Sequence, residues 1–104
     1  MNNINPLELI SRDPVEFSLL SLKSKLVIII TEIIANENFT QKEAAALLGV
    51  TQPRVSNLIN GCINKFSIDT LIEMLGRLGY LMDVSFNPKN EYNPISITVN
   101  KTIV

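Results

Sequence analysis

The sequence predicts a mainly α-helical domain that ends in one or two β-strands and follows an N-terminal segment that is disordered in the free protein. Two short helical patterns are separated by a single glycine, longer apolar helical stripes flank them, and an alternating apolar stretch comes last. The 104 residues suffice for one small domain. We expect residues 1–20 to form the N-terminal segment, residues 21–80 the helical domain, and residues 81–104 the strands and a tail.

The N-terminal segment combines apolar side chains with short, interrupted patterns. Asn5 and Pro6 predict the start of a short helix, which Asp13 and Pro14 break, and residues 15–19 alternate as a half-buried strand would. Neither piece is long enough to be stable alone. The segment could pack on its own domain or stay disordered until it wraps a partner, and we favour the partner. The candidate contacts are Ile4, Leu7, Leu9, Ile10, Val15, Phe17 and Leu19.

Residues 21–36 predict the first helix of the helical domain. Propensity alone would make the β-branched run from Val27 to Thr31 a strand. The length of the stretch, and the need to cover the helices that follow, favour a helix. Val27 and Ile28 then fall outside its core face, which we expect to consist of Leu22, Leu26, Ile29, Ile30, Ile33 and Ile34.

Residues 41–60 predict two short helices joined by a tight turn. Thr40 and Glu43 have the spacing of a capping box at the start of the first helix. Gly49 ends that helix, because glycine enters the left-handed conformation at little cost. Thr51 caps the second helix, and Pro53 lies in its first turn. We expect the buried faces to consist of Ala44, Ala45, Leu47 and Leu48, then Val55, Leu58 and Ile59, with Gly61 as the C-terminal cap.

The exposed side of the second short helix carries the functional prediction. It presents no acid, and its polar side chains are Gln52, Arg54, Ser56, Asn57 and Asn60. Arginine reads guanine, glutamine and asparagine read adenine, and serine contacts base or phosphate. These residues predict a helix that enters the major groove of DNA. Two alternatives are an ordinary helical hairpin, and a β-turn between strands at Asn60–Gly61.

The rest of the chain predicts a loop, a helix and one or two strands. Lys65 in the loop either contacts a phosphate or is simply exposed, and Phe66 packs back into the core. Ser67 caps the next helix, whose apolar stripe is Ile68, Leu71, Ile72, Leu75 and Leu78. Residues 80–86 alternate as a strand whose open edge invites a second subunit through Met82, Val84 and Phe86. Residues 95–99 form a second strand, paired either as a hairpin or across a dimer.

Composition excludes several classes of protein. The net charge is −1, but residues 1–20 carry three acids against one base, and residues 41–66 carry three bases against one acid. With Cys62 as the only cysteine and no histidine, we expect no disulfide framework, no metal site, no cofactor and no enzyme activity. We also expect a cytoplasmic protein, because the start is not a secretory signal and no apolar run is long enough to span a membrane.

The short helical pair resembles the helix-turn-helix of the Cro/repressor (XRE-like) family. The resemblance rests on the small Ala45 where the helices cross, on Gly49 at the turn, and on apolar Ala44, Leu48, Val50, Val55 and Leu58. The longer stretch from about residue 22 to 86 resembles HigA-type antitoxins of HigBA toxin–antitoxin modules. Its matching motifs are FTQKEAA, TQPRVSNLING, INKFSIDTL, and LG before a strand.

The resemblance implies a homodimer that binds a palindromic operator and represses its own operon. It also implies a protein partner, a small RelE/HigB-like toxin that cuts mRNA. Base recognition carries over to Gln52, Arg54, Ser56 and Asn57, and phosphate contacts carry over to Gln41, Thr51 and Lys65. Toxin binding by the N-terminal segment rests on its apolar composition and not on a motif. The alternative function is a stand-alone dimeric Cro-like repressor with no toxin partner. No membrane contact or small-molecule ligand is expected.

Overall fold

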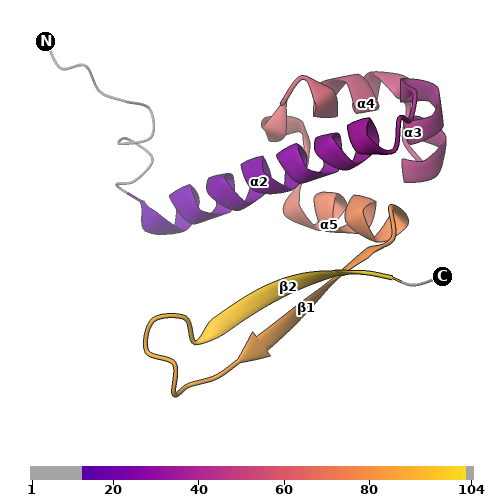
Figure 1. Cartoon of the computed structure of the whole chain (residues 1–104). Coiled ribbons are helices and arrows are strands. Elements are labelled where there is room, and N and C mark those ends of the chain that lie inside the picture. The colour runs from indigo at the N-terminus through magenta and orange to yellow at the C-terminus, as the bar shows by residue number, and fades with distance from the viewer. Residues whose placement is uncertain (1–12, 103–104) are drawn as a thin grey trace, which may run out of the picture.

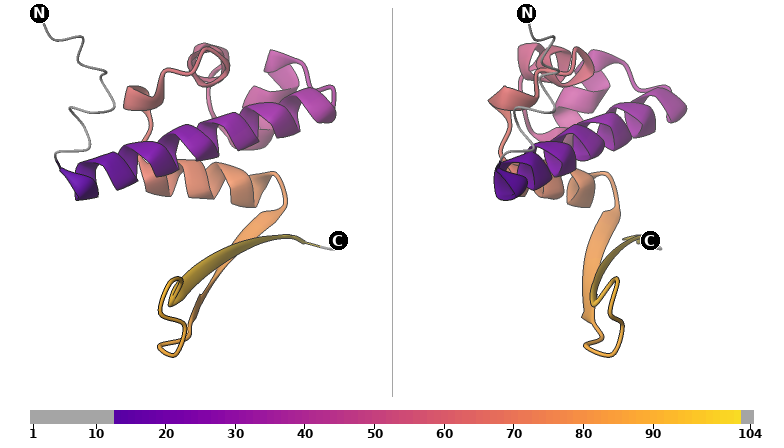
Figure 2. Two further views of the ribbon diagram at one scale, coloured as in Figure 1. Left: turned by 60° about the vertical axis from the view of Figure 1, so that its left-hand side comes forward. Right: turned by 90° about the vertical axis from the view of Figure 1, so that its left-hand side faces the viewer.

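The computed structural model describes residues 13–102 and is mainly helical, with one small antiparallel sheet. The long helix α2 lies between α3 and α4 on one side and α5 on the other (Figure 1). The two strands form a hairpin that extends away from the helices (Figure 2). The elements are α2 (Pro14–Asn36), α3 (Gln41–Leu48), α4 (Gln52–Ile59), the 3₁₀ turn η1 (Ile63–Lys65), α5 (Ile68–Arg77), β1 (Tyr80–Phe86) and β2 (Ile95–Lys101).

Helix α2 begins seven residues earlier than the sequence predicted. The Asp13 carboxylate accepts hydrogen bonds from the backbone N–H groups of Val15 (3.1 Å) and Glu16 (3.2 Å), and Pro14 occupies the first turn. Asp13–Pro14 therefore starts a helix, so the strand predicted over residues 15–19 is wrong. The division expected after residue 20 falls inside α2. The short helix predicted at Asn5, and the candidate contacts Ile4, Leu7, Leu9 and Ile10, lie outside the described residues.

The predicted core face of α2 is correct except at two positions. Val27 is 3% exposed although it was expected outside the core, and Ile29 is 41% exposed although it was expected inside. The reason is that α2 packs against α4 and α5 together, which shifts its buried stripe toward Val27. Ile28 is exposed as predicted. The remaining predicted face is buried or partly buried, namely Leu22, Leu26, Ile30, Ile33 and Ile34.

The capping box at the start of α3 is confirmed. The Thr40 hydroxyl accepts from the Glu43 N–H at 3.1 Å, and the Glu43 carboxylate accepts from the Thr40 N–H at 2.9 Å. The bond from the Thr40 backbone, followed by the bond to its side chain, lowers the pKa of Glu43. Gly49 ends α3 with φ +71°, as predicted. Leu47, predicted to be buried, is 40% exposed because α3 packs on the core through Ala44, Ala45 and Leu48.

Helix α4 begins and ends largely as predicted. The Thr51 hydroxyl accepts from the Arg54 N–H at 3.4 Å. Val55 and Leu58 are buried, whereas Ile59 is 39% exposed on the last turn, where no helix covers it. Gly61 has φ +73°, which suits the residue after a C-cap. The β-turn alternative is excluded, because α4 and η1 flank Asn60–Gly61.

Helix α5 completes the core. Ser67 caps it as predicted, accepting from the Thr70 N–H at 3.3 Å. Phe66 is 1% exposed, which confirms its predicted burial. Ile72, predicted in the buried stripe, is 37% exposed, and Met74 is buried instead. The stripe is therefore rotated by part of a turn toward α2 and α3, the helices that α5 contacts.

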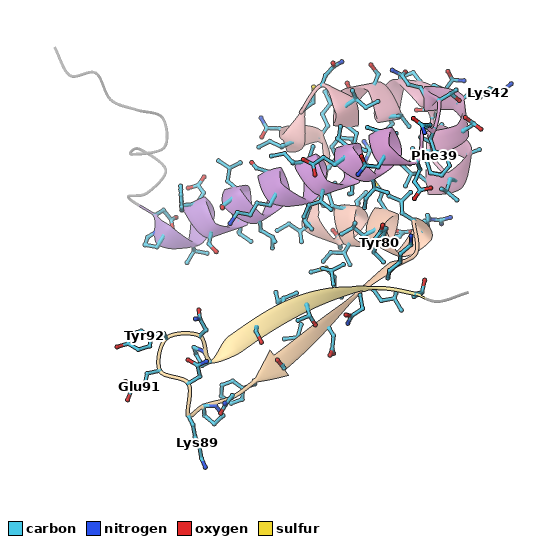
Figure 3. The ribbon with its side chains drawn as sticks, viewed as in Figure 1. Phe39, Lys42, Tyr80, Lys89, Glu91 and Tyr92 are labelled. Carbon is cyan, nitrogen blue, oxygen red and sulfur yellow. The ribbon has the colours of Figure 1, made fainter. Side chains whose placement is uncertain are left out.

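The two strands pair within the chain as an antiparallel hairpin. Cross-strand pairs place Met82 opposite Val99, Val84 opposite Ile97, and Phe86 opposite Ile95, all on one face. Met82 packs against the helical core, but the other five are 43% to 67% exposed. At the tip, Lys89, Glu91 and Tyr92 point away from the helices (Figure 3). The hairpin therefore leaves most of an apolar face uncovered.

We predict that Val27→Ala lowers the free energy of unfolding by about 2 kcal/mol, because it removes two buried methyl groups and leaves a cavity. The matched control is Ile28→Ala, which changes an exposed residue one position away and should cost about 0.5 kcal/mol or less. Urea unfolding monitored by circular dichroism measures both values. A larger loss at Ile28 than at Val27 would contradict the observed orientation of α2.

Candidate nucleic-acid interface

Helix α4 lies on the surface of the helical domain with its apolar residues turned inward. Val55 and Leu58 are 0% and 1% exposed. Gln52 is exposed on the other side, and Ser56 and Asn57 are half-buried. Three of the predicted base-reading side chains are thus brought together along one helix of eight residues. Because no acid lies on α4, this face does not repel phosphate.

The N-terminal end of α4 adds fixed positive charge to the same surface. A helix N-terminus carries free N–H groups and the positive end of the helix dipole. Pro53 lies in this first turn, and the Thr51 hydroxyl caps the Arg54 N–H, so the first turn is well ordered. Thr51 itself is exposed, as its predicted phosphate contact requires.

Arg54 does not extend freely from α4. Its Nη1 donates a hydrogen bond to the backbone carbonyl of Lys65 at 3.2 Å. Its Cζ atom lies 4.6 Å from the centroid of the Phe66 ring, in the geometry of a cation–π contact. The residue predicted to read guanine is therefore engaged by the loop that follows α4. One of the five N–H donors of the guanidinium is therefore already used within the free protein.

The remaining predicted DNA contacts lie at three places around α4. Lys65 is exposed at the end of η1, which Arg54 holds against the first turn of α4. Gln41 is exposed in the first turn of α3. Asn60 lies at the other end of α4, where its amide is 3.4 Å from the Ser56 hydroxyl.

Residues 41–66 carry three bases and one acid. Lys42 points outward from α3 (Figure 3). Glu43 is the one acid among them, and its carboxylate is bound by the capping box at the start of α3. The capping hydrogen bonds lower the pKa of Glu43 and favour its ionised form, so its negative charge stays at the start of α3.

The predicted partner-binding residues that the structure describes lie in the first two turns of α2. Val15 and Leu19 are 69% and 50% exposed. Phe17 is half-buried beside a groove of about 400 Å³ between the first turns of α2 and the hairpin. The groove is lined by Phe17, Ser18, Ser21, Leu22, Lys25 and Ile97. Leu19 also lines a pocket with Asn64 and Ser67, so this surface adjoins the loop that carries Lys65.

Sequence reasoning missed the contact between Arg54 and Phe66. Both residues were noted, one as a base reader and the other as a core residue. A cation and an aromatic residue twelve positions apart give no local signal, because the loop between them has no regular period. The contact follows from the path of the chain after Gly61, whose positive φ turns it back along α4.

No helix within residues 13–102 is both long and apolar enough to cross a membrane. A search of curated proteins gives no match. A solved chain described as a candidate XRE family transcriptional regulator is 26% identical to this one, with a TM-score of 0.59. The similarity covers 81% of this chain and 92% of that chain. A family model described as a helix-turn-helix domain matches residues 13–87, from the N-cap of α2 to just past the end of β1. The chain therefore belongs to this helix-turn-helix domain family, and its helices have an XRE-like fold.

Proposed function

We propose that the protein is a transcriptional regulator that binds operator DNA, with α4 as the helix that enters the major groove. One observation carries the proposal: α4 is a capped surface helix with a buried apolar side and a polar, acid-free outer side. A helix of this kind fits the major groove, where base edges present a distinct pattern of donors and acceptors. Membership of the helix-turn-helix family supports the same function.

The side chains on α4 divide into two roles. Gln52, Ser56 and Asn57 are the proposed base readers, because they lie on the outer side and Gln52 makes no competing contact within the described residues. Gln41, Thr51 and Lys65 are the proposed phosphate contacts around them. Phosphate contacts set affinity and register, while base contacts set the choice of sequence. Asn60 extends the polar face to the last turn of α4.

We propose that two copies bind together through the apolar face of the hairpin. Five of the six side chains on this face are 43% to 67% exposed, and a contiguous exposed apolar patch often marks an interaction site. It carries the predicted contacts Met82, Val84 and Phe86, together with their partners Val99, Ile97 and Ile95. A two-fold dimer would place two recognition helices about 34–36 Å apart on a palindromic operator.

The finer proposal is that this regulator is an antitoxin that neutralises a RelE/HigB-like mRNA-cleaving toxin and represses its own operon. The motif resemblance supports it, and so does the exposed apolar surface at Val15 and Leu19. Figure 1 shows the first turns of α2 running out beyond α5. A plain dimeric repressor without a toxin is the alternative.

We predict that Gln52→Ala changes which sequences the protein selects from a pool of random 24-base-pair duplexes. The base that Gln52 reads should lose about 1–3 kcal/mol of discrimination. Gln41→Ala is the matched control: the same substitution at a proposed phosphate contact should weaken binding without changing the selected motif. An unaltered motif for Gln52→Ala would remove Gln52 from the reading face.

We predict that Ile97→Lys disrupts the dimer, because it buries a charge in the proposed interface. Thr98→Lys is the control, since it adds the same charge at the next position on the opposite face of β2. Analytical ultracentrifugation should show monomers for Ile97→Lys and dimers for Thr98→Lys and the unaltered chain. Dimers in all three samples would place the interface elsewhere.

We predict that Val15→Asp weakens toxin binding by at least about tenfold, because it removes an apolar anchor worth roughly 1.5 kcal/mol or more. The control is Ile28→Asp, which adds the same charge at an exposed apolar position farther along α2. Calorimetric titration with the product of the neighbouring reading frame measures both, and growth on co-expression reports neutralisation. Equal affinity for Val15→Asp and the unaltered chain would remove Val15 from the toxin-binding surface, and no binding by the unaltered chain would argue for the plain repressor.

A further inference from the structure

Arg54 joins the first turn of α4 to the loop that follows the helix. Its Nη1 bonds the Lys65 carbonyl at 3.2 Å, and its guanidinium lies over the Phe66 ring at 4.6 Å. Phe66 is 1% exposed, so this ring is fixed in the hydrophobic core. The guanidinium is thus held by one rigid ring and one backbone carbonyl, which fix its position in the free protein.

The loop is attached to α4 at two points. The Cys62 N–H donates to the Asn57 carbonyl at 2.9 Å near the end of α4, and Arg54 holds Lys65 near its start. Between them, the turn has three short-range bonds: Ile63 N–H to the Gly61 carbonyl (2.8 Å), Lys65 N–H to the Cys62 carbonyl (3.1 Å) and Phe66 N–H to the Ile63 carbonyl (3.2 Å). Single 3₁₀ turns have weak hydrogen bonds, so the bond from Arg54 adds a side-chain attachment at Lys65, which lies between Ile63, packed against the core, and the buried Phe66.

This attachment gathers positive charge at one end of α4. The exposed Lys65, the Arg54 guanidinium and the helix N-terminus have the same sign, so they would repel one another in the absence of an anion. The cation–π contact and the carbonyl bond offset that repulsion. A surface of this kind suits a phosphate group of the DNA backbone.

We propose that Arg54 is a positioning residue that holds Lys65 beside the start of α4 for contact with a DNA phosphate, and does not read a base. The proposal rests on the proposed function, in which α4 enters DNA. It changes the role that the residue type alone suggested, because arginine on a recognition helix usually reads guanine.

The first test uses the free protein and no DNA. Arg54→Ala should speed amide hydrogen exchange at Lys65 and Phe66, while the amides of Val55 and Leu71 in the core exchange as before. Lys42→Ala removes a cation that has no such attachment and should change none of them. Unchanged exchange at Lys65 and Phe66 in Arg54→Ala would overturn the proposal, because the loop would then be held without Arg54.

The second test is a double-mutant cycle on a mixed pool of random-sequence 24-base-pair duplexes at fixed salt. Lys65→Ala should weaken binding about tenfold, the scale of one hydrogen bond to a charged group. Arg54→Ala should weaken it to a similar extent, and the loss in the double variant should be clearly smaller than the product of the two single losses. Thermal unfolding of each variant separates these losses from a general loss of stability.

Two results of the cycle would overturn the proposal. Losses that multiply in the double variant would mean that Arg54 contacts DNA independently of Lys65. Unchanged binding of Arg54→Ala to the mixed pool, together with the loss of one guanine from its selected motif, would make Arg54 a base reader. If the unaltered chain binds no duplex, the proposed function fails, and the exchange experiment still decides whether Arg54 holds the loop.

Discussion

The burial of α2 on two sides is the constraint on which the rest of the helical domain depends. Its apolar stripe meets α4 on one side and α5 on the other, and Ile30 is fully buried at the centre. Neither α3 nor α4 exceeds eight residues, and helices this short are not stable alone in water. Helix α4 persists because it packs on α2 and α3, and α3 because it packs on α4 and α5. The orientation of α4 is therefore set by side chains on other helices.

Local signals in the sequence predicted the starts and ends of the short helices correctly. Thr40, Gly49, Thr51 and Ser67 all act as the sequence indicated, because each cap depends only on residues within a few positions. The same local logic was ambiguous at Asp13–Pro14, which can break one helix or begin another. The helix that follows decides between these interpretations, and the sequence predicted that helix to begin at residue 21 and not at Pro14.

The sequence did not predict how the helices pack against one another or which side chains from distant segments meet. Whether Val27 or Ile29 is buried depends on the angle at which α2 meets its neighbours, and helical periodicity does not fix that angle. For the candidate site, the position and polarity of α4 followed from the sequence. The side-chain conformation of Arg54 did not, because its partner Phe66 is brought near by the path of a loop.

The attachment of the hairpin has a consequence for how such a regulator evolves. The Gly79 carbonyl accepts from both the N–H (2.7 Å) and the hydroxyl (2.9 Å) of Thr102, so the two ends of the hairpin are fastened at the point where it leaves α5. In the proposed dimer, this fastening sets the distance between the two recognition helices. The spacing of the two half-sites would then depend on residues near Gly79 and Thr102, and the sequence of each half-site would depend on residues of α4. Mutations near Gly79 would change the distance between the two recognition helices without changing the bases that α4 prefers. Selection could therefore act on the two properties separately.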